Sequence, residues 1–170
     1  MRQYAFYLDL NRCVGCQACA VACMDQNDLL LDQGQPAWRR VFTVEDEEAG
    51  KIKITYVTMA CMHCHDAPCI MACPTGAIHR EGRGTAVLVN SSLCIGCHSC
   101  AMACPFGVPR FGLDGKMQKC RLCIERVEVG LEPACVLTCP TRALKFGPVN
   151  EITVQIQTRA ASKLARAVSL

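Results

Sequence analysis

The cysteines constrain the fold of this 170-residue chain more than any other feature, because all sixteen fall into four runs of four. In chain order the runs are Cys13, Cys16, Cys19 and Cys23; Cys61, Cys64, Cys69 and Cys73; Cys94, Cys97, Cys100 and Cys104; and Cys120, Cys123, Cys135 and Cys139. Every run begins with two cysteines separated by two residues and ends with two separated by three, and a proline follows three of the four runs. This spacing is typical of iron–sulfur ligands. In two-cluster ferredoxins, the last cysteine of a run binds the other cluster.

The number of cysteines also matches a whole number of cubane clusters. Four [4Fe–4S] clusters need about sixteen thiolates, so the runs predict four such clusters as cofactors. Zinc is the main alternative, since CxxC pairs also build Cys₄ zinc sites. Zinc ribbons pair two CxxC motifs across a long spacer, however, and these runs do not follow that pattern. The histidines are then not needed as ligands, and we expect them to contact solvent or to pack around the cysteines.

The composition indicates that the clusters replace part of the hydrophobic core. Aromatic residues make up only 5% of the chain, and the hydrophobic 51% includes the sixteen cysteines. We therefore expect little stable structure without iron and sulfide, as in small domains that fold around zinc. The formal charge of +3 counts the cysteines as neutral. Sixteen thiolates and four [4Fe–4S]²⁺ cores would change it to about −5, which argues against a nucleic-acid partner.

The sequence also bears on compartment and membrane. The first residues, Met1–Asp9, contain neither an apolar signal-peptide core nor a twin arginine. Charged residues interrupt every apolar stretch before it reaches about 18 residues, so we expect no membrane span. The prediction is a cytoplasmic protein, with export alongside a signal-bearing partner as the alternative.

A short unit, a strand followed by a polar residue and a cysteine loop, recurs along the chain and predicts an internal repeat. Tyr4–Leu8 and Ala86–Val89 are predicted strands. Asp9 and Asn90 follow them, four positions before the next cysteine, where each side chain is expected to cap the turn. A strand, a cysteine loop, a short helix and a second strand make up the ferredoxin module.

The repeat predicts an α+β fold of two nested bacterial-type two-cluster ferredoxin modules, with short strands and short helices around four clusters. The predicted division is an outer module at 1–24 plus 112–148 (runs one and four), a connecting loop and strand at 25–51, an inserted module at 52–111 (runs two and three), and a tail at 149–170. We also expect a strand pair at Val41–Val44 and Lys51–Val57, and a short tail helix at Thr158–Val168.

These features together resemble a known family. The matching segments are Tyr4–Asp9, Trp38–Val41, all four cysteine runs and Ala143–Pro148. The chain resembles the four-cluster electron-transfer (beta) subunits of the dimethyl sulfoxide reductase and polysulfide reductase type. It is also similar to the iron–sulfur subunit of tungsten aldehyde oxidoreductase complexes. The resemblance covers roughly residues 3–148.

The resemblance implies how the cysteines are shared among the clusters. The implied ligand sets are Cys13, Cys16, Cys19 and Cys139; Cys23, Cys120, Cys123 and Cys135; Cys61, Cys64, Cys69 and Cys104; and Cys73, Cys94, Cys97 and Cys100. In each set one ligand comes from a different run than the other three, as in two-cluster ferredoxins.

No nucleophile–base pair, phosphate loop or dinucleotide fingerprint occurs in the sequence, so we expect no catalysis by this chain alone. The predicted function is to relay single electrons as a subunit of an oxidoreductase complex. The resemblance implies a catalytic subunit with a molybdenum or tungsten pterin as one partner. The other would be a second redox subunit, such as a flavoprotein, a quinone-linked anchor or a ferredoxin. The alternatives are a free cytoplasmic polyferredoxin and a zinc-stapled structural protein.

Overall fold

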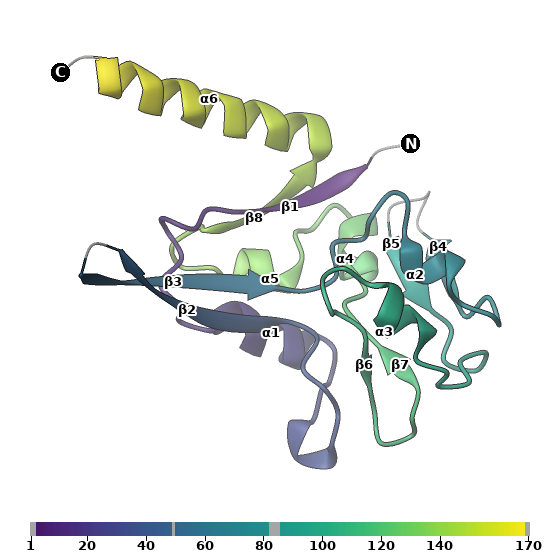
Figure 1. Ribbon diagram of the computed structural model, residues 1–170. Coiled ribbons are helices and arrows are strands. Elements are labelled where there is room, and N and C mark those ends of the chain that lie inside the picture. Colours follow the sequence, from purple (N-terminus) through teal and green to yellow (C-terminus); the bar gives the residue numbers. More distant parts are fainter. Residues whose placement is uncertain (1–2, 49, 82–85, 169–170) are drawn as a thin grey trace.

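The computed structural model describes residues 3–48, 50–81 and 86–168. It has the predicted α+β class, with short strands and mostly short helices (Figure 1). The strands are β1 (Tyr4–Leu8), β2 (Arg40–Glu48), β3 (Lys51–Met59), β4 (Ile78–Glu81), β5 (Ala86–Val89), β6 (Arg110–Phe111), β7 (Met117–Gln118) and β8 (Leu144–Pro148). The helices are α1 (Ala18–Gln26), α2 (Pro68–Met71), α3 (Ser99–Ala103), α4 (Ile124–Glu128), α5 (Ala134–Leu137) and α6 (Val149–Val168), with a 3₁₀ turn at Leu31–Gln33.

Within the described ranges, the strands form four antiparallel two-stranded sheets, β1–β8, β2–β3, β4–β5 and β6–β7. The β1–β8 sheet joins segments near the two ends of the chain, with Tyr4 opposite Pro148 and Leu8 opposite Leu144. Its packing is aromatic, since the Tyr4 and Phe146 rings stack with centroids 5.1 Å apart. This sheet brings the first and fourth cysteine runs together, while the β4–β5 sheet lies between the second and third runs.

The predicted strands are confirmed. β1 and β5 have the predicted bounds, and the expected strand pair is present as the longer β2–β3 hairpin. The predicted caps are also present, because Asp9 Oδ1 accepts the Asn11 N–H at 3.1 Å and Asn90 Oδ1 accepts the Ser92 N–H at 3.0 Å. Each cap closes the turn from a strand into a cysteine loop.

The short helices position cysteines. α1 contains Cys19 and Cys23, while α2, α3 and α5 contain Cys69, Cys100 and Cys135. α2 begins at a proline and α5 directly follows one, a residue favoured at the first helical turn. α1 packs against α5, which brings cysteines of the first and fourth runs into contact range.

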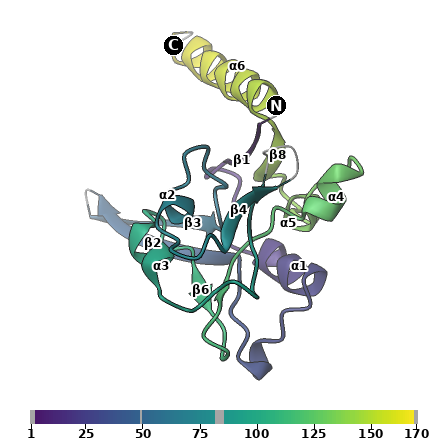
Figure 2. The same cartoon turned by 90° about the vertical axis from the view of Figure 1, so that its right-hand side faces the viewer.

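The tail helix is longer than predicted. α6 begins at Val149, nine residues before the expected start at Thr158. Its first half is rich in β-branched residues, which have low helix propensity, so the sequence does not indicate a helix there. Tertiary contacts supply the stability: Ile152 is buried against Gly147, and Arg159 pairs with the buried Asp9. The remainder of α6 extends away from the body of the molecule (Figures 1 and 2).

The core consists of three small groups of apolar side chains, in keeping with the low aromatic content. Two of them include cysteines among their buried members, Cys100 in one and Cys135 in another. Val87 and Val136 are among the most completely buried side chains. In the part of the chain that the structure describes, no helix has the length and apolar character needed to cross a membrane.

Candidate metal centres

All four CxxC loops make the same backbone turn. The residue before the second cysteine has positive φ in each loop: 68° at Gly15, 47° at His63, 68° at Gly96 and 65° at Leu122. In two of the loops this residue donates its backbone N–H to the first cysteine, from His63 to Cys61 Sγ and from Leu122 to Cys120 Sγ, both at 3.4 Å. Hydrogen bonds to sulfur stabilise its ionised form, so the loops are shaped to hold thiolates.

A second repeated turn follows the Cys-Pro dipeptides. The third residue after the cysteine has positive φ at Gly76, Gly107 and Arg142. Thr75 Oγ1 lies 3.7 Å from Cys73 Sγ, and Thr141 Oγ1 lies 3.8 Å from Cys139 Sγ. Burial acts to raise the pKa of Cys73 and of Cys139, but hydrogen bonds from backbone amides and from these hydroxyls outweigh it, so both pKa values are lowered.

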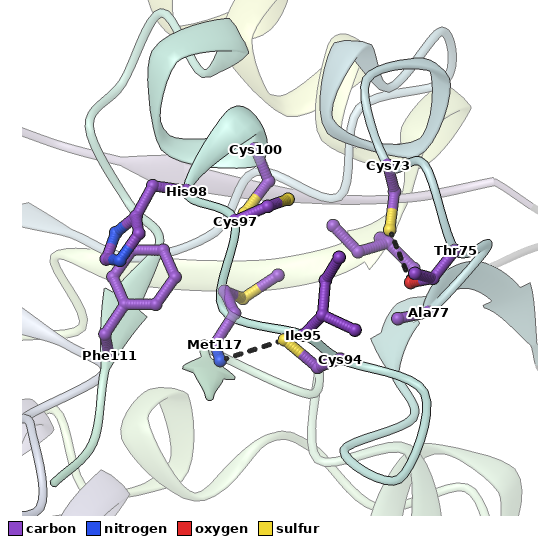
Figure 3. Close-up of a pocket in the computed structure, with 11 residues that line it drawn as sticks. Cys73, Thr75, Ala77, Cys94, Ile95, Cys97, His98, Cys100, Phe111 and Met117 are labelled. Carbon is purple, nitrogen blue, oxygen red and sulfur yellow. Dashed lines mark hydrogen bonds between the residues drawn. The ribbon is translucent and has the colours of Figure 1, made fainter. Parts of the chain in front are cut away.

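Three hollows of similar size are each lined by four cysteines. The Cys13 site is lined by Cys13, Cys16, Cys19 and Cys139; the Cys61 site by Cys61, Cys64, Cys69 and Cys104; and the Cys73 site by Cys73, Cys94, Cys97 and Cys100. Figure 3 shows how the four cysteines of the Cys73 site surround a shared space.

The other four cysteines are the most buried group. The Cys23 site comprises Cys23, Cys120, Cys123 and Cys135, all of which are buried. Burial and the charges of Cys120 and Cys135 raise the pKa of Cys23 to about 12. Burial also raises the pKa of Cys135 to about 11. Thiols with such high pKa values ionise only when a cation or metal binds them. Metal ligation of the four cysteines would meet this requirement.

The four sites follow one another through the molecule. Burial is the largest cause of the raised pKa of Cys135, Cys61 and Cys100, and in each case a cysteine of a neighbouring site adds to it. The charge of Cys19, in the Cys13 site, raises the pKa of Cys135. The charge of Cys120, in the Cys23 site, raises that of Cys61, and the charge of Cys69, in the Cys61 site, raises that of Cys100. The spatial order is therefore the Cys13, Cys23, Cys61 and Cys73 sites.

The donor sets fit the predicted cofactor. Four sulfurs around one space are the ligands that a [4Fe–4S] cluster requires. Among the described residues, no group of three or more His, Cys, Asp or Glu side chains is arranged to hold a single metal ion. Ligation by the individual cysteines stays a prediction.

Two buried cations lie beside the sites. Arg39 is 3% exposed, donates to Thr58 Oγ1 at 3.1 Å, and lies near cysteines of the Cys13 and Cys23 sites. Lys119 is 4% exposed, and its charge opposes the burial-driven rise in the pKa of both Cys61 and Cys120. The sequence contains no signal that separates the buried Arg39 from its exposed neighbour Arg40, because both lie in one short polar segment.

The histidines do not share one role. His65 and His79 contact Asp66 and Glu81, carboxylates that are largely exposed, and the His98 ring packs against Phe111. His63, in contrast, is buried, and its Nδ1 accepts the Val87 N–H at 3.0 Å. Trp38, in the segment before β2, is half-buried and donates Nε1–H to Gln118 Oε1 at 3.3 Å.

Comparison with known families supports the same chemistry. Two models of the 4Fe-4S dicluster domain match the chain, one over residues 52–149 and the other over residues 12–77. The protein thus belongs to the class of dicluster iron–sulfur proteins. Two dicluster domains together with sixteen cysteines imply four [4Fe–4S] clusters.

Curated relatives identify the family more closely. The chain is 39% identical over 170 residues to the B subunit of the anaerobic dimethyl sulfoxide reductase of Haemophilus influenzae, an alignment that covers 94% of this chain and 81% of the relative. It is 40% identical over 159 residues to the B subunit of the Escherichia coli enzyme, covering 88% and 76%. It is also 40% identical over 179 residues to the iron–sulfur subunit of the nitrate-inducible formate dehydrogenase of Escherichia coli, covering 96% and 60%. The chain belongs to this family of iron–sulfur electron-transfer subunits, as its cysteine runs predict.

Proposed function

We propose that the chain relays single electrons through four clusters between a molybdenum- or tungsten-pterin catalytic subunit and a second redox partner. The observation that carries this proposal is the presence of four cysteine quartets, each assembled from two separate runs and arranged in one spatial order. When bound, each [4Fe–4S] cluster supplies a one-electron redox centre, with a potential between about −700 and +450 mV. The protein holds these centres, spaces them and excludes water from them.

The exposure of the cysteines supports a linear relay with two open ends. The two exposed cysteines are Cys16 and Cys97, and they belong to the first and last sites in the spatial order. All four cysteines of the Cys23 site, in contrast, are buried. Electrons would enter and leave at the Cys13 and Cys73 sites, where partner subunits can approach the ligands.

The nested division of the chain is part of the same proposal. An outer module at 1–24 plus 112–148 would hold the Cys13 and Cys23 sites, and an inserted module at 52–111 the Cys61 and Cys73 sites. The pairing of β1 with β8 supports the outer module, and that of β4 with β5 supports the inserted one. We further propose assembly in the cytoplasm, with export beside a signal-bearing partner as the alternative.

The relatives support the proposed complex, since they are named as parts of dimethyl sulfoxide reductase and formate dehydrogenase. The large apolar side chains exposed on β2–β3 and α6, including Phe42, Ile52, Ile54 and Val154, supply surface that a partner subunit would cover. Both elements extend from the body of the molecule (Figure 1). We expect an obligate complex with at least one catalytic subunit.

Native mass spectrometry of protein purified anaerobically from its source tests the proposal. We expect about sixteen iron atoms per chain and co-purification with a subunit that contains pterin-bound molybdenum or tungsten. A stable monomer with all its iron would instead support a free polyferredoxin. Zinc in place of iron would support a structural protein and overturn the electron-transfer function.

A further inference from the structure

Lys119 occupies the boundary between the two middle sites. It follows β7 and directly precedes Cys120 of the Cys23 site, and its side chain is directed toward β5, whose residue Val87 lines the Cys61 site. The residue is only 4% exposed. A lysine is almost never buried to this extent without partners for its ammonium group, so its surroundings need an explanation.

Two hydrogen bonds of the Lys119 ammonium group are directed to backbone carbonyl groups. Nζ donates to the Val87 carbonyl oxygen and, at 3.2 Å, to the Cys120 carbonyl oxygen. The Cys61 side chain also lies close, since the Lys119 charge opposes the burial-driven rise in the pKa of Cys61. The ammonium group thus binds the backbone of Cys120, from the Cys23 site, and lies close to Cys61 of the Cys61 site.

The surroundings of Lys119 hold it rigidly. The Val87 carbonyl oxygen accepts a hydrogen bond from Lys119 Nζ, and the Val87 N–H donates to His63 Nδ1 at 3.0 Å. The His63 backbone N–H donates in turn to Cys61 Sγ at 3.4 Å. A continuous chain of hydrogen bonds therefore runs from Lys119 through Val87 and His63 to Cys61 and positions the ammonium group relative to the Cys61 site.

No carboxylate balances this buried charge. Among the ion pairs formed by the described residues, none includes Lys119. A buried cation without an acidic partner is costly unless another negative group lies close. The negative groups nearby are the cysteine sulfurs of the Cys23 and Cys61 sites.

We propose that Lys119 raises the reduction potentials of the two middle clusters together and so keeps the centre of the relay easy to reduce. The inference rests on the proposed function, because it requires clusters at both sites. Reduction adds one negative charge to a cluster, and a fixed cation nearby stabilises the reduced form relative to the oxidised form. Because the ammonium group lies close to predicted ligands of both sites, a single substitution should affect both clusters.

The test is a redox titration of the full chain, purified with its partners, in which electron paramagnetic resonance follows each cluster. In Lys119→Gln and Lys119→Met, the equilibrium constant for reducing each middle cluster should fall at least tenfold, equivalent to about 59 mV. The clusters of the Cys13 and Cys73 sites should change by less than about threefold, since they lie farther from the substituted charge. Lys119→Arg keeps the charge and should retain most of the wild-type potentials.

The matched control is Arg121→Gln, which removes the same charge two positions away. Arg121 is half exposed and pairs with Glu125, so its removal should change no potential by more than about twofold. Unchanged middle potentials in the Lys119→Gln variant, or equal shifts in Arg121→Gln, would overturn the inference. If Lys119→Gln and Lys119→Met both lose iron while Lys119→Arg keeps it, the site of the loss decides. In that case, loss from a middle site supports the inference, and loss from an end site contradicts it. A wild-type chain with fewer than four clusters would count against the proposed function itself.

Discussion

The Cys23 site and the Cys73 site each contain four cysteine sulfurs, but their surroundings are opposite. The exposed fractions of Cys23, Cys120, Cys123 and Cys135 are 5%, 6%, 8% and 4%. In the Cys73 site Cys97 is exposed, and only Cys100 is buried. The pKa values follow this difference, since burial first and neighbouring thiols second raise that of Cys23 to about 12. Hydrogen bonds to Ser99 lower the pKa of Cys97.

The contrast shows that one repeated loop can serve two purposes. At the Cys23 site, α1 and α5 pack around the cysteines, so the protein itself shields the site from water. At the Cys73 site the loop carrying Ile95 and Cys97 lies at the surface, with Ile95 68% exposed. The following experiments test whether the two sites differ as this comparison implies.

The largest expected effect comes from removing a buried ligand. Cys135→Ser should remove the cluster of the Cys23 site and destabilise the surrounding fold, because α5 loses both its metal bond and its packing. Cys97→Ser should remove only the cluster of the Cys73 site. Iron analysis and circular dichroism check this: we expect loss of about a quarter of the iron and a preserved fold for Cys97→Ser, and larger losses of both for Cys135→Ser. Equal effects would mean that burial does not distinguish the sites.

The second prediction concerns the long-range pairing of ligands. Cys139→Ser should damage the cluster held by Cys13, Cys16 and Cys19, although more than a hundred residues separate them in the sequence, because Cys139 lines the same hollow. Electron paramagnetic resonance of the reduced variant should lose the signal of that cluster alone. Damage confined to the cluster of Cys120, Cys123 and Cys135 would show that the pairing is wrong.

The third prediction concerns the order in which iron is lost. A strong iron chelator added to the full complex under mild denaturant should remove iron from the Cys73 site before the Cys23 site, because the ligand Cys97 is open to solvent. Timed sampling with electron paramagnetic resonance measures the order. Protection of the Cys73 site in the complex, but not in the dissociated chain, would show that a partner covers it. Earlier loss from the Cys23 site would contradict the comparison.

The sequence predicts the cofactor class and the fold because cysteine spacing is a local property of the chain. Runs of cysteines with fixed gaps indicate the loops, and the strands beside them, such as Tyr4–Leu8 and Ala86–Val89, are short and apolar. The predicted ligand sets come from family resemblance, and the hollows group the cysteines of three sets in the same way.

Other features depend on tertiary contacts that no local pattern encodes. The first half of α6 is stabilised by Ile152 and by the Arg159–Asp9 pair, against its own propensity. The burial of Arg39 and His63 depends on elements far away in the sequence, such as Thr58 in β3 and Val87 in β5. The spatial order of the sites is likewise a property of how the modules pack.

The smallest expected effect tests the backbone turns of the Cys73 site. Gly76 and Gly96 have nearly equal φ, 64° and 68°, but their surroundings differ. A Cβ atom at Gly76 would meet nothing within 4 Å, whereas one at Gly96 would lie 2.6 Å from the Gly115 carbonyl oxygen. Arg142 adopts the same turn as Gly76 with a φ of 51°, so a side chain is tolerated at that point of the repeat.

Gly76→Ala should therefore cost only the backbone strain, about 1 kcal/mol, and lower the apparent melting temperature of the holoprotein by about 2–4 °C. All four clusters should be retained, as measured by iron content. Gly96→Ala, the matched variant, adds a clash with backbone that cannot move without distorting the loop of Cys94 and Cys97, so it should lower the melting temperature further and weaken this cluster. Equal effects of the two substitutions would show that the CxxC turn is no more constrained than the turn after Cys73. The exposed Cys73 site would then tolerate distortion of either turn.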